Sequence, residues 1–208
     1  MLDNQKIRSQ FPFFKHTESV YLDNGATTQK PQSVIDAITA FYTCHNANVH
    51  RGVSEFASNT TALYEQARTK LADFCQVDTE QIVWTKGATE AINLVANSID
   101  AHIEKDDVII ISALEHHANI VPWQTLCKRT GATLHILPVD ANGVLNLDVS
   151  LAMINTLKPK LMAISHASNT LGNILPIQSL LDAAHAINAI TLVDGAQAMQ
   201  HLRPNIRA

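Results

Sequence analysis

This 208-residue sequence has a small net charge and few cysteines, and each of these shortages excludes a class of protein. The formal net charge is -4 at pH 7, so there is no basic excess of the kind that nucleic acid or an anionic membrane surface requires. The three cysteines, Cys44, Cys75 and Cys127, are odd in number and widely spaced, which is typical neither of a disulfide framework nor of a Cys-x-x-Cys metal site. We therefore expect a small-molecule ligand and a reducing compartment.

Long apolar runs are missing as well. No stretch approaches the roughly 18 apolar residues that a membrane-spanning helix needs, and the first ten residues, MLDNQKIRSQ, contain no apolar segment typical of an export signal. Hydrophobic residues still make up 46% of the chain, which is the proportion of an ordinary globular protein. We expect a cytoplasmic protein that contacts neither membrane nor nucleic acid.

Short apolar runs alternate with helix-forming stretches from residue 81 onward. The runs are rich in Ile, Val and Leu: QIVWT (81–85), DVIIIS (107–112), TLHILPV (133–139), KLMAISH (160–166) and AITLVD (189–194). Helices are expected between them, over residues 89–98, 120–130, 147–157 and 176–188. Runs that lack in-and-out alternation and are separated by helices predict a parallel sheet covered on both faces. The fold class is therefore α/β, a doubly wound and mostly parallel sheet in which each run is a buried strand.

Two further helices are expected before the first run. One has Pro31 in its first turn and extends to about residue 44. The other covers about residues 58–75 and carries apolar residues at helical spacing, namely Ala62, Leu63, Ala67, Leu71 and Phe74. The stretch between them, HNANVHRGVSE, predicts a polar loop.

Ligands of open α/β sheets bind outside the carboxyl ends of the strands, so the residues after each run are candidate site residues. After the first run, Ala88 and Thr89 begin a helix whose free N–H groups favour a phosphate, although an ordinary N-cap is the alternative. After the second run, His116 can stack on an aromatic ligand, act as acid or base, or be merely structural. No metal is expected, because the side chains of His116 and His117 diverge and no further ligand follows at metal-binding spacing.

Two more polar residues follow the later runs. Asn169 offers an amide that both donates and accepts, although an Asn beside Gly172 is also a common turn residue. Asp194 ends the last run, and a carboxylate at that place needs a positive partner. A phosphate seat, a flat ring, an amide and an acid together suit a phosphorylated heteroaromatic cation.

Six motifs resemble, in order and spacing, the N-terminal half of the cysteine desulfurases of the class V aminotransferase group. They are YLDNGATTQKPQ, NANVHRG, WTKGATEAINLVA, EHHANIVPWQ, SHASNTLGN and VDGAQA, and the resemblance covers nearly all of residues 10–203. It implies pyridoxal 5′-phosphate (PLP) on a fold type I scaffold, with residues 1–20 as an N-terminal segment and residues 21–208 as an incomplete PLP-binding large domain. It also implies L-cysteine as substrate, alanine and an enzyme-bound persulfide as products, a sulfur-acceptor protein in iron–sulfur cluster assembly, and a homodimer.

The resemblance gives three residues roles around the cofactor ring. Asp194 would pair with the protonated pyridine nitrogen, because a nearby carboxylate favours that charged form and a protonated ring is the better electron sink. Gln197, three residues later on the same turn, would reach the 3-oxygen of the ring. His116 would stack on the ring face and shuttle protons, which makes it the candidate catalytic residue.

Five other residues receive roles away from the ring. Asn169 would contact the region where cofactor and substrate meet, and Ala88 with Thr89 would hold the phosphate. His50 and Arg51 resemble loop residues that approach the substrate, in this family often from the partner subunit.

The sequence also departs from the family pattern. Gly25 stands where alanine is usual, and Ala88 where threonine is common. The lysine to which the cofactor is covalently attached, the sulfur-accepting cysteine and the carboxylate-binding arginine belong to the later half of the family, and no lysine follows Lys160 here. Two strands that would join the first run to the strand ending at Asp194 are absent too. We therefore expect a truncated domain that is poorly stable, prone to aggregation and inactive by itself.

Two other interpretations stay open. Another class V PLP enzyme, such as a selenocysteine lyase, would share the same cofactor residues. A non-catalytic remnant, produced by an early stop or a frame change, is suggested by the last eight residues, HLRPNIRA, in which the resemblance fades. A nucleotide-binding Rossmann domain is disfavoured, because no Gly-x-Gly-x-x-Gly follows the first run.

Overall fold

Four of the five apolar runs form the strands of one parallel sheet. The computed structural model describes residues 3–202 and residue 206, and the chain divides into an N-terminal unit up to Ile82 and a sheet unit, Val83–Pro204. The strands are β1 (Val108–Ser112), β2 (Thr133–Leu137), β3 (Leu161–Ser165) and β4 (Ile190–Asp194), in the order β2-β1-β3-β4. All three neighbouring pairs are parallel, as the sequence predicts.

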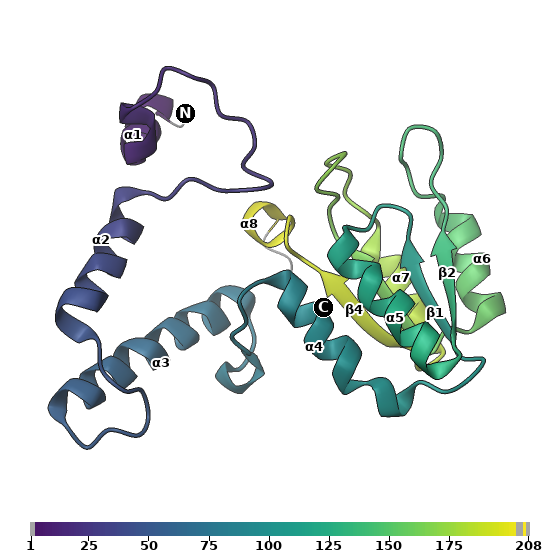
Figure 1. Ribbon diagram of the computed structural model, residues 1–208. Helices are drawn as coiled ribbons and strands as arrows, with labels where there is room; N and C mark the ends of the chain where they lie inside the picture. Colours follow the sequence, from purple (N-terminus) through teal and green to yellow (C-terminus); the bar gives the residue numbers. More distant parts are fainter. Residues whose placement is uncertain (1–2, 203–205, 207–208) are drawn as a thin grey trace. The chain divides into compact units, whose positions relative to one another are not determined.

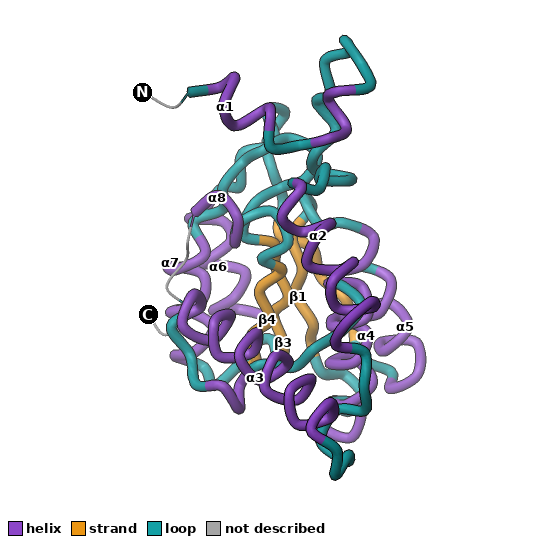
Figure 2. The backbone as a smooth tube through the Cα atoms, turned by 90° about the vertical axis from the view of Figure 1, so that its left-hand side faces the viewer, coloured by secondary structure: helices purple, strands orange, loops and turns teal. Residues whose placement is uncertain are grey.

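Successive residues of β1 point to opposite faces of the sheet, and each face has its own core. Ile109 and Ile111 pack with α4 (Ala88–Ser98) and α5 (Val121–Thr130). Ile110 packs on the other face with α6 (Leu147–Leu157) and α7 (Ile177–Ala186). Figure 2 shows these helix pairs on either side of the strands. Burial of each such side chain contributes roughly 1.5–3 kcal/mol, so the doubly wound prediction is confirmed and its cause is a sheet that is apolar on both faces.

The two outer strands are less buried than predicted. Residues of β1 and β3 are almost all inaccessible, whereas Ile136 of β2 is 53% exposed and Val193 of β4 is 37% exposed. Within the described residues, each outer strand has a neighbour on one side only. The expectation of uniformly buried strands is therefore wrong for β2 and β4, because burial of a strand depends on both of its neighbours.

The first apolar run is not a strand. Residues 82–85 follow a short 3-10 helix, η3 (Thr79–Gln81), and lie outside the sheet, with Val83 68% exposed and Trp84 43% exposed. An apolar run becomes a strand only where a neighbouring strand accepts its backbone hydrogen bonds, and the described part of the chain offers none to these residues. The prediction of a strand here is wrong.

The connecting helices begin and end at residues whose side chain or backbone conformation caps the helix. The Asn146 side chain accepts a hydrogen bond from the Val149 N–H at 3.1 Å and so caps α6. Gly131, at φ +85°, ends α5 in the left-handed region that glycine enters without strain. Short elements complete the unit: η4 (Asp100–His102), η5 (His117–Asn119) and α8 (Met199–Leu202).

The N-terminal unit is helical. Its elements are α1 (Asn4–Ser9), η1 (Pro12–Lys15), α2 (Gln32–Ala40), a π-helical turn η2 (Phe41–His45), α3 (Glu55–Cys75) and η3 (Figure 1). The predicted helices are therefore present, with Pro31 as the N-cap of α2 rather than within its first turn. The Ser54 side chain caps α3 by accepting from the Ala57 N–H at 3.3 Å.

Helix α3 buries a different face from the one that its apolar residues mark. Ala57, Thr60, Ala72 and Cys75 are buried, whereas Leu63 is 42% exposed and Phe74 44% exposed. No helix within the described ranges is both long enough and apolar enough to cross a membrane.

Candidate active site

Asp194 lies at the carboxyl end of β4 and is held there by its own turn. The residue is 8% exposed, and its Oδ1 accepts a hydrogen bond from the Ala196 N–H at 2.9 Å. Its backbone carbonyl accepts from the His166 N–H at 3.0 Å, which continues the β3–β4 pairing past the last residue of β3. The Ala196 N–H thus orients the carboxylate, and the His166 N–H fixes the backbone that carries it.

Gln197 and Asn169 meet in one hollow. The turn after Asp194 is closed by the Gly195 carbonyl, which accepts from the N–H groups of Ala198 (2.9 Å) and Met199 (3.0 Å). Gln197 lies on this turn and lines an open hollow of about 290 Å³ together with Asn169. The other lining residues are Ala167, Ser168, Gly172, Ile174, His201 and Leu202. The structure therefore brings together two residues that are 28 positions apart in the sequence.

His116 lies four residues beyond the end of β1 and is exposed. It is the N-cap of η5, and its Nδ1 accepts a hydrogen bond from the Ala118 N–H at 3.2 Å. Because Nδ1 accepts, the neutral ring carries its proton on Nε2. The ring is therefore oriented by its own backbone, and it lies edge-on to the ring of His117 with 6.0 Å between centroids.

The predicted phosphate seat is the first turn of α4. Ala88 and Thr89 are its first two residues, both are exposed, and Gly87 is the N-cap. A Cβ added at Gly87 would meet no atom within 4 Å, so there is open space beside the turn. Helix α4 leads back to the start of β1 and packs against η5, which places its N-terminus at the same end of the sheet as the strand carboxyl ends (Figure 1).

His50 and Arg51 belong to the N-terminal unit, and the described contacts of His50 lie within that unit. The His50 Nε2 atom is 3.1 Å from the Glu65 carboxylate, and its backbone N–H donates to the Thr61 hydroxyl at 3.0 Å. Its ring lies edge-on to Tyr64 with 5.4 Å between centroids. The structure thus anchors His50 on α3.

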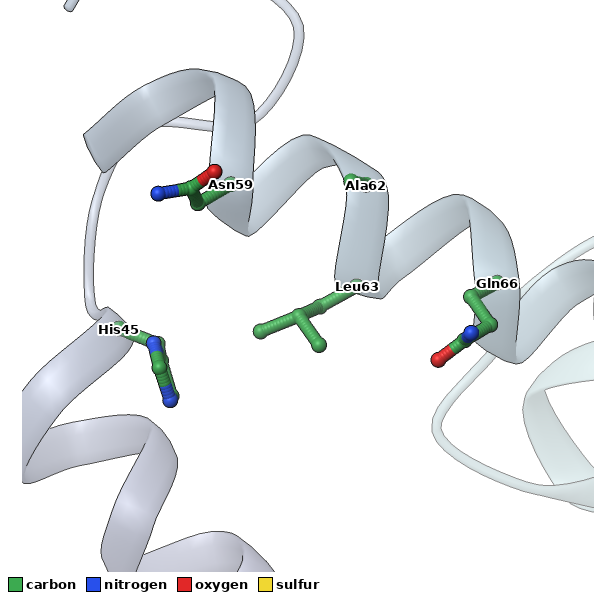
Figure 3. Close-up of a pocket in the computed structure, with 5 residues that line it drawn as sticks. All are labelled: His45, Asn59, Ala62, Leu63 and Gln66. Atoms are coloured by element: carbon green, nitrogen blue, oxygen red, sulfur yellow. The ribbon is translucent and has the colours of Figure 1, made fainter. Parts of the chain in front are cut away.

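A second hollow in the N-terminal unit contains none of the predicted site residues. It is lined by His45, Asn59, Ala62, Leu63 and Gln66 (Figure 3). Leu63 points from α3 into this hollow, opposite His45. No Lys, Arg, Asp or Glu side chain of the described residues lines it.

Glu115 is a polar residue at the strand ends that the sequence interpretation missed. It is 9% exposed and accepts hydrogen bonds from Ser112, Asn119 and Ser165, all of which are also buried. The signal was present, because an acid follows the buried run 107–112, which itself ends in Ser112, and Ser165 is the last residue but one of the run 160–166.

Burial shifts the pKa of two groups in the sheet unit. Desolvation lowers the pKa of His166 below its ordinary value of 6.5, so the ring beside the β4 end is kept neutral. Desolvation also raises the pKa of the Cys127 thiol, with a smaller opposing contribution from its backbone hydrogen bond. Cys127 is therefore a poor nucleophile. No cluster of three His, Cys, Asp or Glu suited to a metal occurs in the part of the chain that the structure describes.

The sequence matches one known family over most of its length. The pattern of the Aminotransferase class-V family covers residues 20–208. A probable cysteine desulfurase from Vibrio cholerae is 41% identical over 214 aligned residues, which take in 100% of this chain and 53% of the relative. The chain thus spans about half the length of the curated relatives it matches.

Solved structures give the same result. The apo cysteine desulfurase of Thermococcus onnurineus superposes with a TM-score of 0.92 at 34% identity, over 98% of this chain and 50% of that one. A C-DES mutant with glycine covalently linked to its PLP cofactor superposes with a TM-score of 0.81 at 27% identity, over 96% of this chain and 52% of that one. The fold is therefore that of PLP-dependent enzymes, as the sequence predicts.

Proposed function

Because this chain belongs to the class V aminotransferase family, we propose that it is part of a PLP-dependent cysteine desulfurase and that its sheet unit forms one wall of the cofactor site. The observation that carries the proposal is the buried Asp194 carboxylate at the end of β4. A carboxylate is an acceptor only, and at a strand end it suits an N–H⁺ group of a ligand.

The surrounding residues fit the rest of a phosphorylated pyridine ring. His116 would lie against the ring, Gln197 would donate to its 3-oxygen, and Asn169 would face the substrate side. Gln197 and Asn169 share one hollow, which supports these assignments. When bound, PLP supplies the electron sink for bond changes at the substrate carbon.

The phosphate would bind at the first turn of α4. Ala88 and Thr89 lie on an exposed helix N-terminus with open space beside Gly87, and Thr89 adds a hydroxyl donor. Such a turn favours a phosphate through its free N–H groups and the helix dipole.

The activity proposed for the longer protein converts L-cysteine to L-alanine and leaves a persulfide on the enzyme. The sulfur would pass to an acceptor protein for iron–sulfur cluster assembly. We assign His50 and Arg51 to the approach of the substrate, in a cytoplasmic homodimer where the partner supplies this loop. In the chain itself no lysine follows Lys160, so we expect it not to turn over cysteine alone.

A binding measurement tests the cofactor assignment. PLP titrated into the 208-residue chain should bind non-covalently, and Asp194→Asn should weaken binding by about 10-fold or more, since a hydrogen bond to a charged group contributes roughly 1.5–3 kcal/mol. Asp148→Asn, the same change on the exposed first turn of α6, is the control. Equal weakening in both variants would contradict the assignment of Asp194.

Borohydride treatment and a product assay test the expected inactivity. Borohydride should attach no cofactor to any lysine, and the chain with L-cysteine and PLP should release no more alanine than PLP alone. A lysine labelled stoichiometrically would overturn the view that the covalent attachment site lies outside this chain.

A further inference from the structure

Glu115 is a buried carboxylate whose described partners are all neutral donors. Its Oε1 accepts from the Ser112 hydroxyl at 2.5 Å and from the Ser165 N–H at 2.9 Å. Its Oε2 accepts from the Ser165 hydroxyl at 2.5 Å and from the Asn119 amide at 2.6 Å. None of the ion pairs among the described residues includes Glu115. Four hydrogen bonds therefore offset the cost of burying this group.

The directions of these bonds are forced by two obligate donors. The Trp123 Nε1–H can only donate, and it donates to Asn119 Oδ1 at 2.8 Å. The Asn119 amide nitrogen must then face Glu115. The Leu114 N–H donates to the Ser112 hydroxyl oxygen at 3.1 Å, which leaves the Ser112 proton for Glu115. The network is consistent with one arrangement only.

This network lies where the pairing of β1 with β3 stops. The paired residues of the two strands run from Ile109 with Leu161 to Ile111 with Ala163. Beyond that point Glu115 connects the last residue of β1, Ser112, to the last residue of β3, Ser165. Ser165 is in turn the partner of Asp194 in the β3–β4 register. Hydrogen bonds to the Glu115 side chain therefore connect β1 and β3 beyond the point where their backbone pairing ends.

We propose that Glu115 is a positioning residue that holds His116 at a fixed place relative to Asp194. His116 follows Glu115 directly, and Asn119, which Glu115 also binds, ends the turn that His116 caps. Glu115 thus fixes the backbone on both sides of the imidazole and ties it through Ser165 to the strand that carries Asp194. The proposal rests on the proposed function, since it concerns two residues assigned to the same cofactor ring.

Glu115→Gln is the most direct test because it keeps the shape of the side chain. Glutamine turns one acceptor oxygen into an NH₂ group, which then opposes donors that need an acceptor. Ser165→Ala is a milder variant, because it removes one hydroxyl and leaves the Ser165 N–H in place. Ile154→Val and Ile154→Ala, in the core on the other face of the sheet, supply a graded loss of stability without touching the network.

The first readout is the His116 ring itself and needs no cofactor. Nitrogen-15 NMR of the imidazole should report a single Nε2–H tautomer in the unaltered chain. In Glu115→Gln the ring should populate both tautomers, in Ser165→Ala less so, and in the Ile154 variants not at all. Unchanged His116 signals in Glu115→Gln would overturn the proposal.

The second readout is the affinity for PLP in a double-variant cycle. Glu115→Gln should weaken binding by about 10-fold, the size of one lost, well-directed hydrogen bond. In a His116→Ala background the same change should weaken it no more than about twofold, which is the usual limit of additivity. An undiminished effect in that background would show that Glu115 does not act through His116.

The two hypotheses fail in different ways. If the unaltered chain binds no PLP, the proposed function fails, while the NMR comparison still decides the role of Glu115. If PLP binds but Glu115→Gln behaves like Ile154→Ala at equal stability in both readouts, the carboxylate is merely structural and the positioning role is excluded.

Discussion

The two units of the molecule treat their apolar residues in opposite ways. In the sheet unit, two core clusters fill the two faces of the sheet, and β1 and β3 are almost wholly inaccessible. In the N-terminal unit, α1 and α2 bury no residue, and α3 buries four in 21 residues. An apolar pattern therefore marks a surface that can be buried. The surface is buried only where another helix or strand packs against it.

The same contrast occurs between two apolar runs of similar composition. Residues 108–112 have strands on both sides and helices on both faces. Residues 82–85 have no described strand beside them, and Val83 and Trp84 are exposed. Local propensity favours a strand in both places, so the neighbours decide the outcome.

The largest expected effect compares the two tryptophans. Trp123 is fully buried and donates a hydrogen bond to Asn119, whereas Trp84 is 43% exposed. Trp123→Ala should lower the free energy of unfolding by about 3–5 kcal/mol, because it leaves a large cavity and an unpaired amide. Trp84→Ala should cost less than about 1 kcal/mol. Urea unfolding measures both, and similar losses would break the comparison of the two runs.

A leucine pair sharpens the comparison of the two units. Leu180 of α7 is fully buried and Leu63 of α3 is 42% exposed. Leu180→Ala should destabilise by about 2–5 kcal/mol, and Leu63→Ala by no more than about 0.5 kcal/mol. Thermal unfolding of both variants checks this. A large loss for Leu63→Ala would mean that α3 is covered in solution.

Helix capping should have intermediate effects that differ in kind between the units. Asn146→Ala and Ser54→Ala each remove one side-chain cap, which costs about 1 kcal/mol. In α6 the loss should reduce the stability of the whole sheet unit, because α6 packs on its core. In α3 it should mainly fray the first turn. Amide hydrogen exchange distinguishes a global from a local effect, and global loss from Ser54→Ala would contradict the contrast.

The smallest expected effect is a pH dependence. Burial lowers the pKa of His166, so the unfolded chain binds its proton more readily than the folded one. The contribution of this group to the free energy of unfolding should therefore be fully present above about pH 6.5. It should decrease as the pH falls from 6.5 through the lowered pKa. His166→Gln should flatten this part of the profile in urea unfolding series. A slope unchanged by the substitution would assign the dependence to other groups.

Much of the fold follows from the sequence alone. Unbroken Ile and Val runs separated by helical stretches predict the parallel sheet, because only strands covered on both faces lack alternation. The caps that the structure shows at Asn146 and Gly131 are local as well, because each involves residues only a few positions apart. The sequence also predicts which polar residues lie at the strand ends, because the carboxyl ends of parallel strands share one edge.

Only the tertiary structure decided what depends on distant neighbours. Residues 82–85 lie outside the sheet, and β2 and β4 are partly exposed because they are its outer strands. Helix α3 buries a face other than the one that its apolar residues mark. The tertiary structure also made Glu115 the junction of β1 and β3, through donors as far as 50 residues away in the sequence. A hydrogen bond or a buried contact needs two residues that the fold brings together. The sequence specifies each residue, but its distant partner is decided only by the tertiary structure.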